Sequence, residues 1–435
     1  MHDRNVYPKV ILASVVGSSI EWFDYFLYGT MSSLIISKLF FTNYDAFTAT
    51  LLAYLSFALT FFIRPLGGVF FAHIGDKVGR KKTLVATLML MGGATVAIGL
   101  LPTYAQIGAW APVLLLTLRI VQGLGIGGEW GGALLLAYEY APEGKRSFFV
   151  SFPQAGVTIG MLLSTLAVAF VSLLAEADFI RWGWRIPFLA SGALVFLGLW
   201  IRNGIEETPA FRDARQSESS PRVPLLDLLR HHRGALLMTI GAKVVETAPF
   251  YIFTTFSIGY ATQQLGLERE AALLAVSLGA VVATIAIPLY GMVADHIGKE
   301  KLFLIGCLAT IAVAIPYFTL LDRRSNGALF VAAVLTMGLV WPMLTSSLGS
   351  VFADAFPVHA RYTGVTLGYQ LGAALAGGTA PLIATTLLAL NEDRWMPVAF
   401  YMMGCALISL VAVWVGARHG RRAHPSTPVS LQEGA

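Results

Sequence analysis

Several charged side chains lie inside long apolar segments of this 435-residue chain, among them Glu21, Asp24, Arg119, Glu129, Lys243 and Glu246; three bases, Arg64, Arg119 and Lys243, fall within the segments. A charge in a membrane-spanning segment is costly unless it is paired, so each of these residues is a functional-site candidate by default. A carboxylate near a permanently charged arginine can exchange its proton as its surroundings change. These residue types therefore predict proton exchange in apolar surroundings.

Spacing and depth bring several of these charges together. Glu21 and Asp24 are one helical turn apart and share a helix face. A rise of about 1.5 Å per residue puts Asp24 and Arg119 at a common depth within a membrane core about 30 Å thick. Glu129 comes nearer the inner rim, among glycines. We predict that Glu21, Asp24, Arg119 and Glu129 couple proton movement. The alternatives are a static ion pair for the first three residues and an inner-gate ion pair for Glu129.

The elements that position these charges are membrane-spanning helices. The chain is 56% hydrophobic and 13% charged, with a mean hydropathy of +0.69, whereas soluble domains are about 25% charged. Long apolar runs without period-two alternation are helices in lipid. We expect an all-α membrane protein that is embedded in the bilayer, with no cofactor and no bound metal. The twelve predicted spans are approximately 10–37, 47–73, 83–101, 110–138, 147–175, 185–203, 233–262, 271–294, 301–321, 327–353, 361–390 and 395–417.

The distribution of basic residues predicts the topology. With both termini inside, 20 of the 30 lysines and arginines fall on the cytoplasmic side and seven on the opposite side. Cytoplasmic loops of membrane proteins carry such an excess. The bases lie in short loops between apolar runs, which argues against nucleic-acid binding. No nucleotide-binding motif accompanies them.

The two halves of the chain repeat each other. The loop Gly75–Lys82 and the segment Gly291–Lys301 match at one constant offset, and Glu139–Arg146 matches Asp354–Arg361 at nearly the same offset. Parallel six-helix repeats about an axis along the membrane normal are typical of one large transporter class. The predicted units are a six-helix bundle at 1–203, a cytoplasmic loop at 204–232, a second six-helix bundle at 233–418 and a disordered cytoplasmic tail at 419–435.

Several motifs resemble the major facilitator superfamily, and within it the metabolite:proton symporter family. They are Gly75–Lys82, Glu21–Gly29, Arg64–Gly68, Arg119–Gly123, Gly127–Gly132, Trp182–Pro187, Glu207–Phe211, Arg361–Gly364 and Gly377–Pro381. Ala72 departs from the usual glycine at the start of the first motif, while the second copy keeps Gly291. The resemblance covers nearly the whole chain and implies two pseudo-symmetric six-helix bundles in a bacterial inner membrane. It also implies monomeric, proton-coupled uptake of a small metabolite by alternating access.

The repeat and the spans also predict substrate contacts. The offset that relates the two loops takes Asp24 to Lys243, so each half supplies a cation, Arg119 or Lys243, that suits an anionic substrate such as a carboxylate. Alternatively, Lys243 and Glu246 only satisfy each other. The predicted substrate-binding residues are Tyr25, Tyr28, Arg119, Gln122, Lys243, Glu246, Tyr251, Trp341, Tyr369 and Gln370.

Charges at the cytoplasmic ends of the spans predict a gate. Asp76 is expected to meet the N-terminal end of span eleven, where a helix start attracts an anion, or Arg146. Arg80 is expected to reach Glu139. The complete set of predicted gating residues is Asp76, Arg80, Glu139, Arg146, Asp295, Asp354 and Arg361.

Three other functions fit part of the pattern. A drug or metabolite:proton antiporter would share the fold, but Ser151–Gly160 in span five lacks the Gly-Pro-x-x-Gly-Gly-like signature of such exporters. A proton-independent facilitator would not need Glu21 and Asp24. A non-transporting sensor would carry a sizeable soluble output domain, and the longest predicted internal loop is only 204–232.

Overall fold

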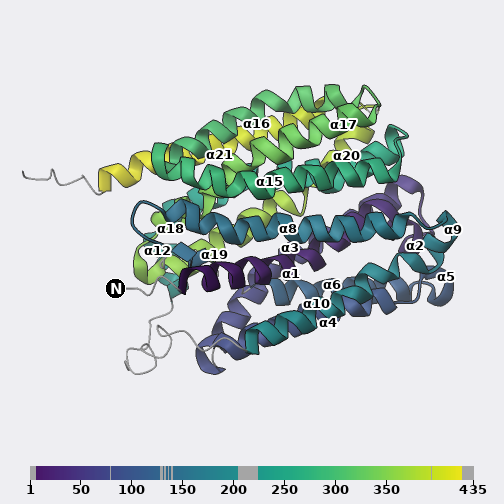
Figure 1. The fold of residues 1–435 in the computed structure, drawn as a ribbon, viewed down its shortest axis with the longest axis horizontal. Coiled ribbons are helices and arrows are strands. Elements are labelled where there is room, and N and C mark those ends of the chain that lie inside the picture. The colour runs from purple at the N-terminus through teal and green to yellow at the C-terminus, as the bar shows by residue number, and fades with distance from the viewer. Residues whose placement is uncertain are drawn as a thin grey trace, which may run out of the picture.

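The structure is a computed structural model, and it describes residues 6–78, 80–127, 131, 134–135, 137–138, 141–203, 224–392 and 394–423. These residues are helical and contain no strand. The long helices run side by side along the long axis of the molecule (Figure 1). The start of α1 and the end of α21 lie at the same end, which we name the termini side. The opposite end is the far side.

Six long helical segments form the first half of the chain. Short helices α5 (Tyr104–Ile107), α9 (Glu176–Asp178) and η2 (Phe179–Gly183) lie in its far-side connections. The six segments are α1 (Val6–Met31) with η1 (Ser32–Ile36) and α2 (Ser37–Phe40), α3 (Ala46–Val78), α4 (Arg80–Leu100), α6 (Trp110–Ile126), α8 (Arg146–Ser172) and α10 (Arg185–Asn203).

Six further segments form the second half, after the short helix α12 (Pro224–His231). They are α13 (Arg233–Tyr251) with η3 (Ile252–Phe256), α14 (Ser257–Gly259) and η4 (Tyr260–Gln264), α15 (Arg269–Ile297), α16 (Lys299–Leu321), α17 (Asn326–Ala333) with η5 (Val334–Val340) and α18 (Trp341–Ala355), α19 (Val358–Gly372) with η6 (Ala373–Gly377) and α20 (Ala380–Leu390), and α21 (Met396–Ala423). The last helix continues past the bundle end predicted at 418, because its backbone ladder extends into the polar residues that follow.

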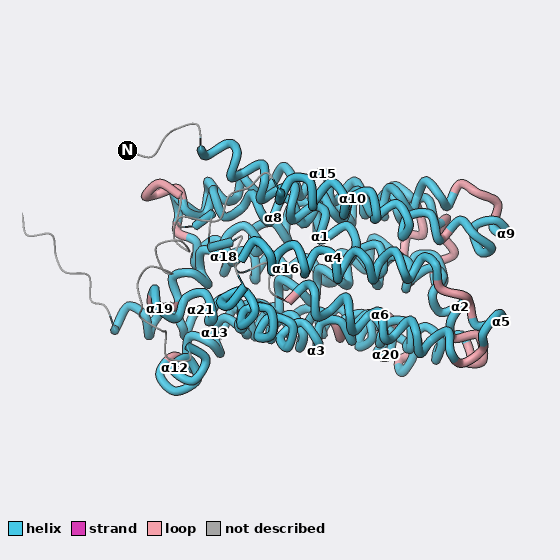
Figure 2. Tube along the Cα trace, turned by 90° about the horizontal axis from the view of Figure 1, so that it is seen from below, coloured by secondary structure: helices cyan, strands magenta, loops and turns pink. Residues whose placement is uncertain are grey.

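These twelve segments of the described chain correspond to the twelve predicted spans. Eight helices are long and apolar enough to cross a membrane, or nine if Glu176–Gly183 and Arg185–Trp200, which meet at 44°, form one bent span. Val85–Leu100 and Trp110–Ile126 are apolar but shorter. The loops lie mainly at the two ends of the bundle (Figure 2). The predicted all-helical membrane fold is confirmed.

Short π-helical segments interrupt several long helices. Segment η3 follows Pro249, and segments η5 and η6 come shortly before Pro342 and Pro381. Proline supplies no N–H to the helical ladder, so the neighbouring turns change their hydrogen-bond register. Such π-helical turns are frequent at functional sites.

The two halves meet along helices near the middle of the molecule. Helix α8 of the first half packs against α15 of the second, and α3 packs against α19, η6 and α20. Within the first half, α6 approaches α3 closely because of its glycines. A Cβ added at Gly123 would lie 2.9 Å from the carbonyl oxygen of Thr60, and one at Gly127 would lie 2.1 Å from that of Arg64. Small residues permit this approach, which brings Arg119 on α6 against the backbone of α3.

Candidate functional site

A small cavity lies between the two halves, near the middle of the long helices. The cavity is small: the volume open to the centre of a water molecule is about 20 Å³, which is room for about one water molecule. The two halves are therefore drawn together around it. The cavity is lined by Trp22, Phe26, Phe61, Arg64, Gln154, Val157, Lys243, Glu246, Thr247, Phe250, Tyr251, Trp341, Thr345, Tyr369 and Ala373.

Lys243 and Glu246 form a buried ion pair on one face of α13. Only 2% of Lys243 and 5% of Glu246 is exposed. The ammonium group also lies 3.6 Å from the centre of the Tyr369 ring, a cation–π distance. The two residues pair with each other, as the alternative interpretation of the sequence expected. Both also line the cavity.

Glu246 connects the second half to the first. Its Oε2 accepts a hydrogen bond from Thr247 at 2.9 Å, and its Oε1 accepts one from Thr345 at 3.1 Å. The hydroxyl of Thr345 in turn accepts a hydrogen bond from Nε2 of Gln154 on α8, at 2.9 Å. The indole of Trp341 donates to the Glu246 backbone carbonyl at 2.7 Å. A polar chain therefore runs across the interface at the cavity.

Arg64 is a buried cation that our sequence interpretation did not assign to the site. Its side chain is 1% exposed and its guanidinium lies 4.2 Å from the Tyr25 ring centre and 4.6 Å from that of Phe61. In the described part of the chain, its Nε and Nη2 have no hydrogen-bond partner. The signal was present in the sequence, since Arg64 is one of the three bases within the predicted spans.

Arg119 lies in a separate polar cluster inside the first half. Its guanidinium donates to the carbonyl oxygens of Ser56 at 3.2 Å and Phe57 at 3.3 Å, and to the side chain of Gln122. It also lies 3.8 Å from the ring centre of Tyr28, whose hydroxyl is 2.5 Å from that of Ser56. Arg119, Gln122 and Tyr28 thus bind one another and the backbone of α3, and they do not line the cavity.

Asp24 is fully buried on α1. Within the described part of the chain, neither of its carboxyl oxygens lies in ideal hydrogen-bond geometry with a partner, and it forms no ion pair with Arg119. The hydroxyls of Ser191 and Thr95 lie beside it. Glu21 is also buried, at 5% exposed, and is near enough to Tyr369 of the second half to interact with it electrostatically. A common depth therefore did not produce an ion pair between Asp24 and Arg119.

Aromatic rings from both halves pack beside the cavity. The ring centre of Tyr251 lies 5.4 Å from those of Phe57 and Phe61, and 6.3 Å from that of Tyr25. Gln370 reaches across the interface and donates to the Gly127 carbonyl at 3.2 Å.

Of the predicted substrate-binding residues, the structure places five on the cavity wall: Lys243, Glu246, Tyr251, Trp341 and Tyr369.

A network of predicted gating residues joins the halves on the termini side. Asp295 at the end of α15 accepts hydrogen bonds from the backbone N–H groups of Ser147 at 2.8 Å and Phe148 at 3.0 Å. These groups open α8, where a helix has unpaired donors and attracts an anion. Asp354 binds both Lys299 and the hydroxyl of Tyr138.

Two arginines pack around Tyr138 in the same network. Arg146 donates to the Tyr138 hydroxyl at 3.1 Å, and its guanidinium lies 4.8 Å from the ring centre. The guanidinium of Arg361 lies 5.6 Å from that ring centre. The remaining predicted residues of the gate and the proton path, namely the side chains of Asp76 and Arg80 together with Glu129 and Glu139, lie outside the described residues.

We expect Asp295→Ala to open the termini side more often. Loss of a charged helix cap costs about 1–2 kcal/mol, so the population of the open form should rise roughly 5- to 30-fold. The rate at which a thiol reagent labels Ser151→Cys, at the interface of α8 and α15, measures this opening. His296→Ala, on the same helix, is the matched control. Equal labelling rates in the two variants would show that the Asp295 cap does not hold this side closed.

An ion pair joins the halves on the far side. Nη2 of Arg269 donates to both carboxyl oxygens of Glu176, at 2.8 and 3.1 Å. Glu176 is half exposed, so the pair is worth only about 0.2–1 kcal/mol.

Reversing the charge in Arg269→Glu should separate the halves on the far side. Spin labels at Leu173 and Leu390, which are 73% and 76% exposed, report the distance between them. The double reversal Glu176→Arg/Arg269→Glu should restore the wild-type distance distribution. A double variant that resembles Arg269→Glu alone would contradict a role for this pair.

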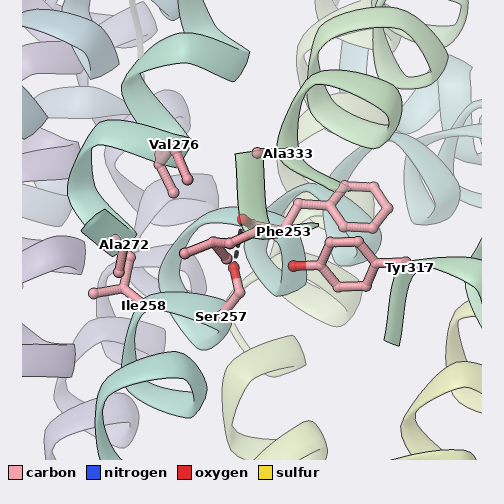
Figure 3. Close-up of a pocket in the computed structure, with 9 residues that line it drawn as sticks. Phe253, Ser257, Ile258, Ala272, Val276, Tyr317 and Ala333 are labelled. Atoms are coloured by element: carbon pink, nitrogen blue, oxygen red, sulfur yellow. Dashed lines mark hydrogen bonds between the residues drawn. The ribbon is translucent and has the colours of Figure 1, made fainter. Parts of the chain in front are cut away.

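A second, smaller cavity lies within the second half, away from these charges. Phe253 and Ser257 face Tyr317 and residues of α15 and α17 there (Figure 3). The Ser257 hydroxyl donates to the carbonyl of Phe253 at 2.5 Å, within π-helical η3 and the turn that follows it. The volume of this cavity that is open to the centre of a water molecule is about 10 Å³. We take it as a packing defect beside η3, because its lining is mostly apolar.

Two helical bundles with a cavity between them, and contacts that close it at both ends, form an arrangement typical of secondary transporters. Residues 15–381 match the family model described as Major Facilitator Superfamily. The chain belongs to this family. It is a transporter and not an enzyme.

Curated bacterial relatives cover almost the same length. The shikimate transporter of Escherichia coli K12 is 37% identical over 412 residues, 93% of each chain. The inner membrane metabolite transport protein YhjE of the same organism is 38% identical over 423 residues, 95% of this chain and 96% of the relative. The proline/betaine transporter of E. coli K12 is 33% identical over 419 residues, 94% of this chain and 83% of the relative.

Solved structures share the fold. The proton:xylose symporter XylE bound to 6-bromo-6-deoxy-D-glucose superposes with a TM-score of 0.76 at 16% identity, over 96% of each chain. A partially occluded inward-open form of XylE from E. coli gives 0.71 at 17% identity, over 94% of this chain and 96% of that one.

Proposed function

We propose that the chain takes up a small organic carboxylate together with protons, by alternating access across a bacterial inner membrane. Its termini face the cytoplasm in this proposal, and the working unit is a monomer. The similarity to shikimate, metabolite and proline/betaine transporters supports a small-metabolite substrate. The excess of basic residues on the termini side supports the orientation.

The proposed proton coupling rests on the burial of Asp24 and on its lack of an ion-pair partner among the described residues. Its carboxyl group is fully buried with no ion-pair partner in the described part of the chain, and only the neutral hydroxyls of Ser191 and Thr95 lie beside it. Burying an unpaired carboxylate is far more costly than burying the neutral acid. We propose that Asp24 carries a proton while the cavity is closed, and that it loses the proton when one side opens to water.

Glu21 and the Lys243–Glu246 pair complete this proposal. Glu21 lies one turn from Asp24 on α1 and extends the proton path towards Tyr369 and the cavity. The polar chain from Gln154 through Thr345 to Glu246 spans both halves, so movement of the halves changes the surroundings of Glu246. Occupation of the cavity and closure of the halves are thereby connected.

Uptake of labelled small carboxylates into proteoliposomes tests the function. An inward proton gradient should drive accumulation above the equilibrium concentration, and dissipating the gradient should abolish it. Equal uptake with and without the gradient would make the chain a facilitator. Accumulation only with the opposite gradient would make it an antiporter.

A further inference from the structure

We propose that Arg64, rather than Arg119 or Lys243, holds the carboxylate of the substrate, and that the substrate carries a single carboxylate. This inference rests on the proposed function in one respect, namely that the cavity receives a carboxylate.

Arg64 lines the cavity, and one edge of its guanidinium makes no hydrogen bond in the described residues. The nitrogens concerned, Nε and Nη2, are buried. These two nitrogens lie on one edge of the guanidinium plane, and such an edge binds both oxygens of a carboxylate. Leaving buried charged donors unsatisfied is costly, so a ligand that binds them recovers that free energy.

Aromatic rings hold Arg64 in place without occupying its donors. The Tyr25 and Phe61 ring centres lie 4.2 and 4.6 Å from its Cζ, and that of Trp22 lies at 5.6 Å. Cation–π contacts use the ring faces and stabilise the cation. Because the N–H groups of Nε and Nη2 make no hydrogen bond in the described residues, the arginine is oriented in advance for a planar anion.

The other two buried cations are already bound. Arg119 donates to two backbone carbonyls and to Gln122, and Lys243 is paired with Glu246. Arg64 is therefore the cavity cation that has no carboxylate partner in the described part of the chain.

One available cation fits one carboxylate. Half of the other wall residues are aromatic, and the polar groups are the amide of Gln154, the hydroxyls of Thr247, Thr345, Tyr251 and Tyr369, the indoles of Trp22 and Trp341, and the Lys243–Glu246 pair, in which the cation is already neutralised. A second carboxylate on the substrate would approach Glu246 or remain unpaired among rings, and burying an unpaired charge is costly. Hydroxyl groups on the substrate, in contrast, match the amide and hydroxyl groups.

The first test needs no substrate. We compare the melting temperature of the purified full-length protein with those of Arg64→Met and Arg119→Met. Because a buried charge with unsatisfied donors costs free energy, Arg64→Met should melt at or above the wild-type temperature. Arg119→Met should melt several degrees lower, since it loses its hydrogen bonds to α3. If Arg64→Met is destabilised as much as Arg119→Met, Arg64 is structural and the inference is wrong.

The second test measures ligand selectivity by thermal stabilisation of the purified wild type. The probes are the monocarboxylates shikimate, proline and lactate, the dicarboxylates succinate and 2-oxoglutarate, and the uncharged sugar xylose. At least one monocarboxylate should stabilise the protein, and the other two classes should not. Arg64→Lys should weaken binding of that monocarboxylate about tenfold or more, because lysine cannot offer two coplanar donors.

Three results would overturn the inference: stabilisation by a dicarboxylate or by xylose, no response to any monocarboxylate, or unchanged affinity in Arg64→Lys. Neither test uses a proton gradient. Uptake that proves independent of the gradient would therefore refute the proposed coupling and leave the role of Arg64 standing. A gradient-driven carrier with unchanged affinity in Arg64→Lys would instead refute the role of Arg64 and leave the coupling standing.

Discussion

Asp24→Asn should abolish accumulation driven by a proton gradient while exchange of labelled for unlabelled substrate continues. Asparagine has nearly the same shape as a protonated aspartic acid but cannot release the proton. The variant therefore resembles the closed, protonated carrier and can still alternate with substrate bound. We expect gradient-driven accumulation to fall at least about 100-fold, as is typical when an essential proton-transfer group is lost, and exchange to fall by less than about tenfold.

Asp178→Asn is the matched control for this prediction, because Asp178 lies in the exposed far-side helix α9. It should accumulate substrate as the wild type does. If Asp24→Asn also accumulates substrate normally, Asp24 has a structural role and the proton must be carried elsewhere.

Glu246→Gln should lower the stability of the protein strongly. Lys243 is 2% exposed and loses its ion-pair partner in this variant. Breaking a buried ion pair by removing one partner costs about 3–5 kcal/mol. We therefore expect the melting temperature of the purified protein to fall by several degrees.

The double variant Lys243→Met/Glu246→Gln separates this cause from simple loss of packing. It removes the unpaired charge together with its partner, so it should melt well above Glu246→Gln. If the two variants melt at the same temperature, the hydrogen bonds of Glu246 to Thr247 and Thr345 matter more than its pairing with Lys243.

Hydropathy was sufficient to predict the helices, because lipid permits few other backbone structures. The pairing of Lys243 with Glu246 could also be predicted, since residues one turn apart on a helix meet whatever the rest of the fold does. Asp295 was predicted as a gating residue, but the group that it binds could not be predicted. Its partner, the start of α8, is set by packing between halves that are far apart in sequence.

The positions of Arg64 and Arg119 could not be predicted in the same way. Depth along a helix follows from counting residues, but the direction of a side chain around the helix depends on which neighbours pack against it. Arg119 faces the backbone of α3 because Gly123 and Gly127 bring the two helices together. Arg64 lines the cavity between the halves together with Lys243, and the repeat offset pointed to Lys243 alone.

The most direct test of joint movement of substrate and proton uses proteoliposomes that are loaded with a pH-sensitive dye. The internal pH is recorded while a transported carboxylate is added outside. We expect the wild type to acidify the lumen as substrate enters. Asp24→Asn should not acidify it, although this variant exchanges labelled substrate. A wild type that imports the same carboxylate without acidifying the lumen would contradict the proposal that substrate and proton cross together.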